Sequence, residues 1–202
     1  MNAVAKSLHE ADGTVQWIRD LSNDALIIEL IQTLNHLSRW LTPIHDRTRL
    51  EVALFRSEVT VKDLLIEMRD TETRTYSLMN AIATQINPDL DRVARVAQSS
   101  QQQAADRQSN ALVIMSELRR VRESSAALLR ALPDTAWERS GYSRTERNWS
   151  IRALGEFLAE NDHVQLAEID RLLLHSGVRS GIAAVSRVRF EDIDAPFVPK
   201  MG

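Results

Sequence analysis

The sequence predicts an all-α protein, an antiparallel four-helix bundle with a long crossover and a C-terminal extension. Four long segments place apolar residues at helical spacing, and no series of strand-like segments accompanies them. The 202 residues include only 6 Gly and 5 Pro, a composition typical of helices. A chain of this length can bury roughly 70% of its unfolded surface. One bundle with a single core is therefore the simplest architecture.

The first long helix is predicted over residues 22–41. Its apolar residues keep helical spacing, Ser22 or Asn23 can cap its N-terminus, and Pro43 follows its end. His36 points about 180° away from the first apolar residue of this stripe on a helical wheel. We therefore expect His36 to be exposed to solvent and not to bind a metal.

The second helix is predicted from Thr60, its N-cap, to about residue 85, where Asn87-Pro88 ends it. Glu67 lies at the margin of the apolar face, about 100° from its centre. It is either a solvated carboxylate or a group that lines the interior. The polar stretch 89–110 is then a loop, a crossover or an extension of the next helix. Such a long link can reverse the chain across a bundle.

The third helix is predicted over residues 111–132, and Pro133 breaks it. Its aliphatic residues point toward a core. We expect four charged residues to face solvent, because arginines in such a run usually form a solvated helix face. These residues are Arg119, Arg120, Arg122 and Glu123.

The fourth helix, within residues 148–174, has the clearest pattern, and Ser150 can cap it. Its aliphatic residues fall within about 60° of one direction. They are Ile151, Leu154, Leu158, Leu166, Ile169, Leu172 and Leu173. Asp162 lies near the middle of the stripe, Gln165 about 40° from it and Asn161 at its edge. Three polar side chains are therefore predicted to point inward.

Two stretches of the sequence carry a family resemblance. LLRALPDTAW, followed by a loop and NWSIRALGEFLAENDHVQLAEI, resembles the C-terminal half of the DinB/YfiT-like superfamily. VTVKDLLIEMRDTETRTYSLMNAIA is similar to the second helix of that family. The resemblance implies a four-helix bundle, often a homodimer, with a divalent metal held by three histidines near one end. Its better understood members resemble thiol-dependent transferases or metal-dependent hydrolases.

The metal-binding histidines of that family are replaced in this chain. The resemblance matches the histidine of the second helix to Glu67, and the spaced pair of the last helix to Asn161 and Gln165. A further histidine found in some members is matched by Phe157. Amide carbonyls are weak ligands for Zn or Ni. We therefore expect no metal cofactor; the alternative is a divalent metal, Ni or Zn, in an altered ligand set that includes Glu67.

The candidate site is the polar group Glu67, Asn161, Asp162 and Gln165. These residues either hydrogen-bond to one another as a structural plug or line a small pocket. Burying them without partners costs roughly 1 to 3 kcal/mol each, so they should satisfy one another, bind water or meet a ligand. Glu67 beside Asp162 would share a proton, because nearby like charges raise one pKa. No catalytic residue is assigned.

Glu160 and His163 have the Glu-x-x-His spacing of di-iron bundles, but such sites use two copies and this chain has one. The wheel places Glu160 about 180° and His163 about 120° from the apolar direction. We therefore expect both side chains to face solvent.

Charge and composition narrow the functional classes. The formal net charge is −3, from 25 basic and 28 acidic residues, which gives no signal for nucleic acid or an anionic membrane. The absence of cysteine excludes disulfides and thiolate chemistry. No stretch approaches the ~20 apolar residues of a membrane span, and the N-terminus lacks a signal-peptide core. We expect a cytoplasmic protein.

Three functional hypotheses follow. In the first, residues 1–180 form a DinB-like bundle with a degenerate metal site that binds a small molecule or a partner, as a homodimer. Residues 181–202 are then an extension that packs on the bundle or on a dimer partner. The second is an enzyme, a metal-dependent thiol S-transferase or hydrolase with an altered ligand set. The third is a structural or stress-related partner protein. Loss of the imidazoles favours binding over catalysis.

Overall fold

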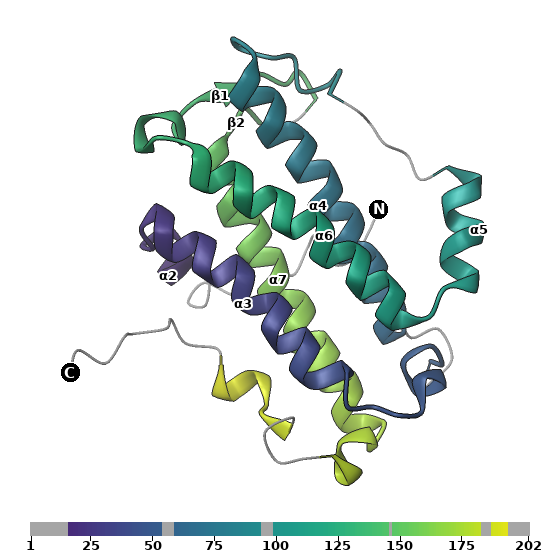
Figure 1. Cartoon of the computed structure of the whole chain (residues 1–202). Helices are drawn as coiled ribbons and strands as arrows, with labels where there is room; N and C mark the ends of the chain where they lie inside the picture. The colour runs from purple at the N-terminus through teal and green to yellow at the C-terminus, as the bar shows by residue number, and fades with distance from the viewer. Residues whose placement is uncertain (1–15, 54–58, 94–98, 146, 183–186, 194–202) are drawn as a thin grey trace, which may run out of the picture.

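The computed structural model describes residues 16–53, 59–93, 99–145, 147–182 and 187–193. Four long helices pack into a bundle (Figure 1), which confirms the predicted fold class with its long crossover. They are α3 (Asn23–Leu41), α4 (Val61–Thr84), α6 (Ala111–Ala131) and α7 (Ile151–His175).

Each long helix begins where a polar side chain caps its first turn. The hydroxyls of Ser22 and Ser150 each accept a backbone N–H three residues ahead. Thr60 forms a reciprocal capping box with Asp63, and Asn110 accepts two N–H groups. Because such caps satisfy N–H groups that the helix leaves free, they fix where each helix starts.

The helices form two diagonal pairs. α3 packs against α6 and α7, and α4 also packs against α6 and α7, so α3 lies diagonally opposite α4. Lys62, at the start of α4, bonds to the Arg107 carbonyl just before α6, so these two helices run in the same direction. Arg152 and Asn23 join the starts of α7 and α3 in the same way. The crossover between α4 and α6 makes this arrangement possible, because it returns the chain to the end where α4 began.

Short helices, single turns and two short strands lie outside the four long helices. α5 (Ser100–Gln108) lies within the crossover, and α2 (Gln16–Arg19) precedes α3. Single turns are η1 (Arg47–Leu50), η2 (Asp134–Ala136), η3 (Val178–Gly181) and η5 (Phe190–Asp192). The two-residue strands β1 (Ser140–Gly141) and β2 (Trp149–Ser150) pair antiparallel before α7.

The core consists of two apolar clusters separated by a polar layer. One cluster lies around the C-terminal ends of α3 and α7 and includes Leu37, Trp40, Leu65, Leu118 and Ile169. The other surrounds the opposite ends and includes Leu26, Met79, Leu129, Trp137 and Leu158. Between them along the helices lie the buried polar residues Thr33, Glu72, Thr75, Arg122, Ser125, Asp162 and Gln165. This layer contains part of the predicted site.

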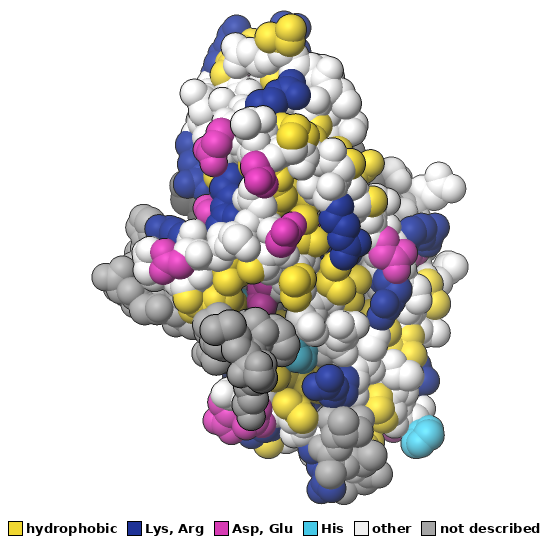
Figure 2. Space-filling view, turned by 60° about the vertical axis from the view of Figure 1, so that its left-hand side comes forward, with side chains coloured by type: hydrophobic (Ala, Val, Ile, Leu, Met, Phe, Trp, Pro, Cys, Tyr) yellow, Lys and Arg dark blue, Asp and Glu magenta, His cyan; other side chains and the backbone are white. Residues whose placement is uncertain are grey.

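The outer surface mixes charge types. On the face seen in Figure 2, acidic and basic side chains are interspersed with apolar ones. Within the described ranges, none of the helices is long and apolar enough to cross a membrane.

Candidate functional site

The four predicted site residues differ in burial. Asp162 and Gln165 are buried, with 2% and 3% of their surface exposed, and Asn161 is half-buried. Glu67 is exposed on α4. The prediction that Glu67 points inward is therefore wrong. A residue about 100° from the centre of the apolar face lies on the solvent side of the helix.

The side chain that meets Asp162 is Arg122 of α6. Arg122 is only 1% exposed, and its Nη1 and Nη2 atoms lie 2.6 and 3.0 Å from the two carboxylate oxygens of Asp162. Nη1 also donates to the Leu30 carbonyl of α3 at 2.6 Å. The prediction that Arg122 faces solvent was wrong. It lies four residues after Leu118 on the inward face of the helix, and its charge alone suggested exposure.

The second carboxylate is Glu72 of α4, and not Glu67 as predicted. Glu72 is fully buried, and its Oε2 atom accepts from Nε of Arg122 at 2.7 Å. Glu72 lies four residues after Met68, so it continues the inward stripe of α4. We call Glu72, Arg122 and Asp162 the central triad. With the Leu30 carbonyl, the triad connects all four helices of the bundle.

Burial controls the protonation of the central triad. It raises the pKa of Glu72, an effect that Arg122 opposes and Asp162 reinforces. Burial alone would lower the pKa of Arg122, but the carboxylates of Asp162 and Glu72 outweigh it and raise that pKa. Arg122 therefore stays charged. The Oε1 atom of Glu72 has no hydrogen-bond partner among the described residues, so it is the atom available to carry a proton. With Glu72 protonated, the triad is neutral.

His163 is also buried, contrary to its predicted position. Its Nε2 atom lies 3.5 Å from a carboxylate oxygen of Glu29, and it is 8% exposed. The ring packs edge-on against Trp17 of α2 and Phe190 of η5, at centroid distances of 5.0 and 5.5 Å. A wheel of α7 alone cannot predict this burial, because the covering residues belong to segments outside the four long helices. Glu160, one turn earlier, is partly buried.

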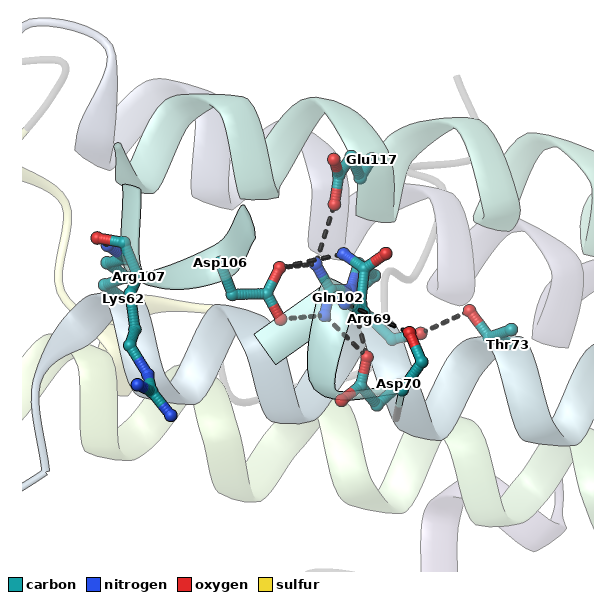
Figure 3. A network of polar contacts seen from close by, with 9 residues as sticks. Lys62, Arg69, Asp70, Thr73, Gln102, Asp106, Arg107 and Glu117 are labelled. Atoms are coloured by element: carbon teal, nitrogen blue, oxygen red, sulfur yellow. Dashed lines mark hydrogen bonds and ion pairs between the residues drawn. The ribbon is translucent and has the colours of Figure 1, made fainter. Parts of the chain in front are cut away.

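A second buried cluster attaches α5 to the bundle (Figure 3). Arg69 of α4 is 5% exposed and donates to both oxygens of Asp106 on α5, at 2.7 and 2.8 Å. It also donates to Asp70 and Glu117. The hydrogen bond from Arg69 is the main cause of the lowered pKa of Asp106. Asp106 is the buried residue of α5, so this ion pair attaches the polar helix to the bundle, together with the hydrogen bond from Lys62 to the Arg107 carbonyl.

The described residues do not fit the metal site that the family resemblance implies. Glu67 is exposed, and Asn161 and Gln165 supply only neutral amide oxygens, which suit neither Zn nor Ni. Arg122 adds a permanent cation beside the buried carboxylates. In the part of the chain that the structure describes, no group of three or more His, Asp or Glu side chains could hold a metal ion.

Comparison with solved structures supports the fold. No protein-family model and no curated protein matches this chain. Among solved structures, it is similar to YfiT from Bacillus subtilis, described as a probable metal-dependent hydrolase with an unusual four-helix bundle topology. The chain has a YfiT-like fold. The match covers 77% of this chain and 87% of YfiT, with a TM-score of 0.63. At 17% identity, the similarity to YfiT shows the fold alone.

Replacing Arg122 by Met should destabilise the protein strongly. The substitution leaves Glu72 and Asp162 buried without their cation, and breaking a buried ion pair in this way costs about 3 to 5 kcal/mol. Arg120→Met, on the exposed side of the same helix, is the matched control and should change stability by less than about 0.5 kcal/mol. Urea denaturation of both variants measures the difference. Equal stability of the two would contradict a structural role for the central triad.

Stability should fall with rising pH because of Glu72. Its raised pKa means that the folded protein retains a proton at pH values where the unfolded chain, with an ordinary Glu pKa of about 4.3, has lost it. The free energy of unfolding therefore declines from that pH up to the raised pKa and then levels off. Glu72→Gln should remove this contribution. Unfolding curves of both proteins across this range test it, and parallel pH profiles would refute it.

Proposed function

We propose that this protein is a small-molecule binding or interaction module built on a YfiT-like bundle whose metal site has degenerated. The observation that carries the proposal is the position of Arg122 between Glu72 and Asp162, in the polar layer at the bundle centre. A guanidinium there neutralises the inward carboxylates with a charge that belongs to the chain itself.

The chemistry of Arg122 supports binding over catalysis. A guanidinium is always charged and serves only as a hydrogen-bond donor. Its N–H groups donate to Glu72, Asp162 and the Leu30 carbonyl. These hydrogen bonds join the four helices. Every side chain of the triad is at least 97% buried, which also separates these carboxylates from any substrate in solution.

Ligand binding would then occur nearer the surface. A cavity of about 560 Å³ lies at the end of α4 and the loop that follows, lined in part by Ser77, Asn80, Asn87 and Arg92. Another, of about 590 Å³, lies where α3 and α7 begin. Both volumes are within the range of small-molecule sites. Of the predicted pocket residues, Glu67 is exposed and Asn161 is half-buried, whereas Asp162 and Gln165 are buried.

The proposal keeps three further predictions: a homodimer, a C-terminal extension that packs on the bundle, and a cytoplasmic location. The family resemblance implies a homodimer, and exposed apolar residues on three helices are available for a contact between copies: Ile28, Val113 and Leu174. The described part of the C-terminal extension contacts the bundle through Arg189, which donates to Asp170. The cytoplasmic location stays a prediction from the sequence.

The alternative is a metal-dependent hydrolase or thiol S-transferase with an altered ligand set. It is supported by the fold shared with YfiT, a probable metal-dependent hydrolase. Such a site would require Glu67 to turn inward from its exposed position and join Asn161 and Gln165. The enzyme hypothesis therefore requires metal binding through Glu67, whereas the binding-module hypothesis does not.

Protein purified and dialysed in the presence of Ni or Zn should retain far less than one metal ion per chain. The expected ligand positions carry weak or misplaced donors, so neither ion should raise the thermal unfolding temperature. Elemental analysis and thermal unfolding with and without a chelator provide the measurement. Glu67→Ala is the control variant. One equivalent of metal that is lost in Glu67→Ala would contradict the proposal and support the enzyme.

A further inference from the structure

A buried arginine near the C-terminal ends of α3 and α7 has an unused edge. Arg179 of η3 is 6% exposed, and its Nη1 atom pairs with a carboxylate oxygen of Asp170. Its Nε and Nη2 atoms are buried and have no hydrogen-bond partner among the described residues. In a guanidinium these two N–H groups point in parallel and form a bidentate donor edge. Arg179 therefore has one satisfied end and one complete edge without an acceptor.

Such an edge is unusual inside a protein. Buried polar groups nearly always have a partner, and leaving one unpaired costs roughly 1 to 3 kcal/mol, more when the group is charged. A neighbouring donor is in the same condition. The indole of Trp40 is fully buried, and its Nε1 atom also has no acceptor in the described ranges. The Cζ atom of Arg179 lies 5.0 Å from the centroid of the Trp40 ring.

The local charge indicates what kind of group is missing. Asp170 accepts from Arg179 and also from Nε of Arg189, at 2.8 Å for the latter contact. Besides Asp170, Glu191 and Asp192 also lie near Arg189 and raise its pKa, so Asp170 is the carboxylate that faces Arg179. His36 was predicted to be exposed, but it is half-buried near Trp40, and burial lowers the pKa of its imidazole. Asp170 satisfies only one end of Arg179, and the two parallel donors of its other edge match an anionic group with at least two acceptor oxygens.

We propose that the unused edge of Arg179 binds an oxyanion, the carboxylate or phosphate group of a small molecule, beside the indole of Trp40. Two oxygens of such a group match the spacing of the two donors, and the buried Nε1–H of Trp40 is a further donor without an acceptor in the described ranges. The inference rests on the proposed binding function and gives it a site and a ligand class. Because both donors are shielded from solvent, binding requires local opening of the surrounding turns.

The test is a titration of the full-length, metal-free protein followed by ¹H–¹⁵N NMR. The chain has four tryptophans, so four indole signals are expected, and Trp40→Phe identifies the relevant one. Sodium acetate and sodium phosphate are added separately, with sodium chloride at equal ionic strength as reference. We expect a saturable shift of the Trp40 signal, larger than at the other three indoles, with acetate, phosphate or both. Acetate alone would identify a carboxylate site, and phosphate alone a phosphate site.

Two matched variants locate the effect. Arg179→Lys keeps the charge beside Asp170 but lacks the bidentate edge, so the saturable shift should disappear. Arg171→Lys, which changes a surface arginine paired with Glu168, should retain it. If Arg179→Lys does not fold, the Nε–H signal of Arg179 in the wild-type protein replaces it and must move as the oxyanion is added.

The site is overturned if chloride produces the same shift, if no shift occurs, or if Arg179→Lys preserves it. The absence of a shift would refute the oxyanion site but would not contradict the proposal that the bundle binds no metal. Stoichiometric metal bound through Glu67 would instead overturn the binding-module proposal, whatever happens at the Trp40 indole.

Discussion

The contact between Arg122 and its two carboxylates is the interaction on which the rest of the bundle depends. Glu72, Asp162 and the Leu30 carbonyl belong to three different helices, and Arg122 on the fourth bonds to all of them. The apolar clusters on either side supply the free energy of burial, which is nearly independent of direction. Hydrogen bonds are directional, so the triad fixes how the helices are aligned along their axes. We infer that its main contribution is to the specificity of the packing, since buried ion pairs add little net stability.

Buried arginines also attach the elements outside the bundle. Arg69 holds α5 through Asp106, and Asp170 receives both Arg179 and Arg189 from the C-terminal segments. Arg69 is surrounded by carboxylates, whereas Arg179 has one carboxylate and an edge without an acceptor in the described ranges. Arg69 therefore has its acceptors within the fold, whereas Arg179 has an edge that still lacks an acceptor in the described ranges.

The sequence was sufficient for the helices and the fold class, because caps such as Thr60 and the spacing of apolar residues are local properties. The inward positions of Asp162 and Gln165 were predicted in the same way. The charges of Arg122 and Glu72 suggest exposure, although each lies four residues after an inward aliphatic or Met side chain. His163 could not be predicted from its own helix, since Trp17 and Phe190 cover it from distant segments. Pairings between helices, such as Arg122 with Asp162, depend on tertiary packing that no single helix pattern contains.

Hydrogen exchange of the Arg122 side chain tests the central claim most directly. If its guanidinium is enclosed between Glu72 and Asp162, its Nε–H signal in ¹⁵N NMR should exchange slowly at neutral pH and should not change when Zn or Ni is added. The exposed Arg120 on the same helix gives the reference rate. Exchange at Arg122 as fast as at Arg120, or a signal that either metal displaces, would contradict an enclosed ion-pair layer at the centre of the bundle.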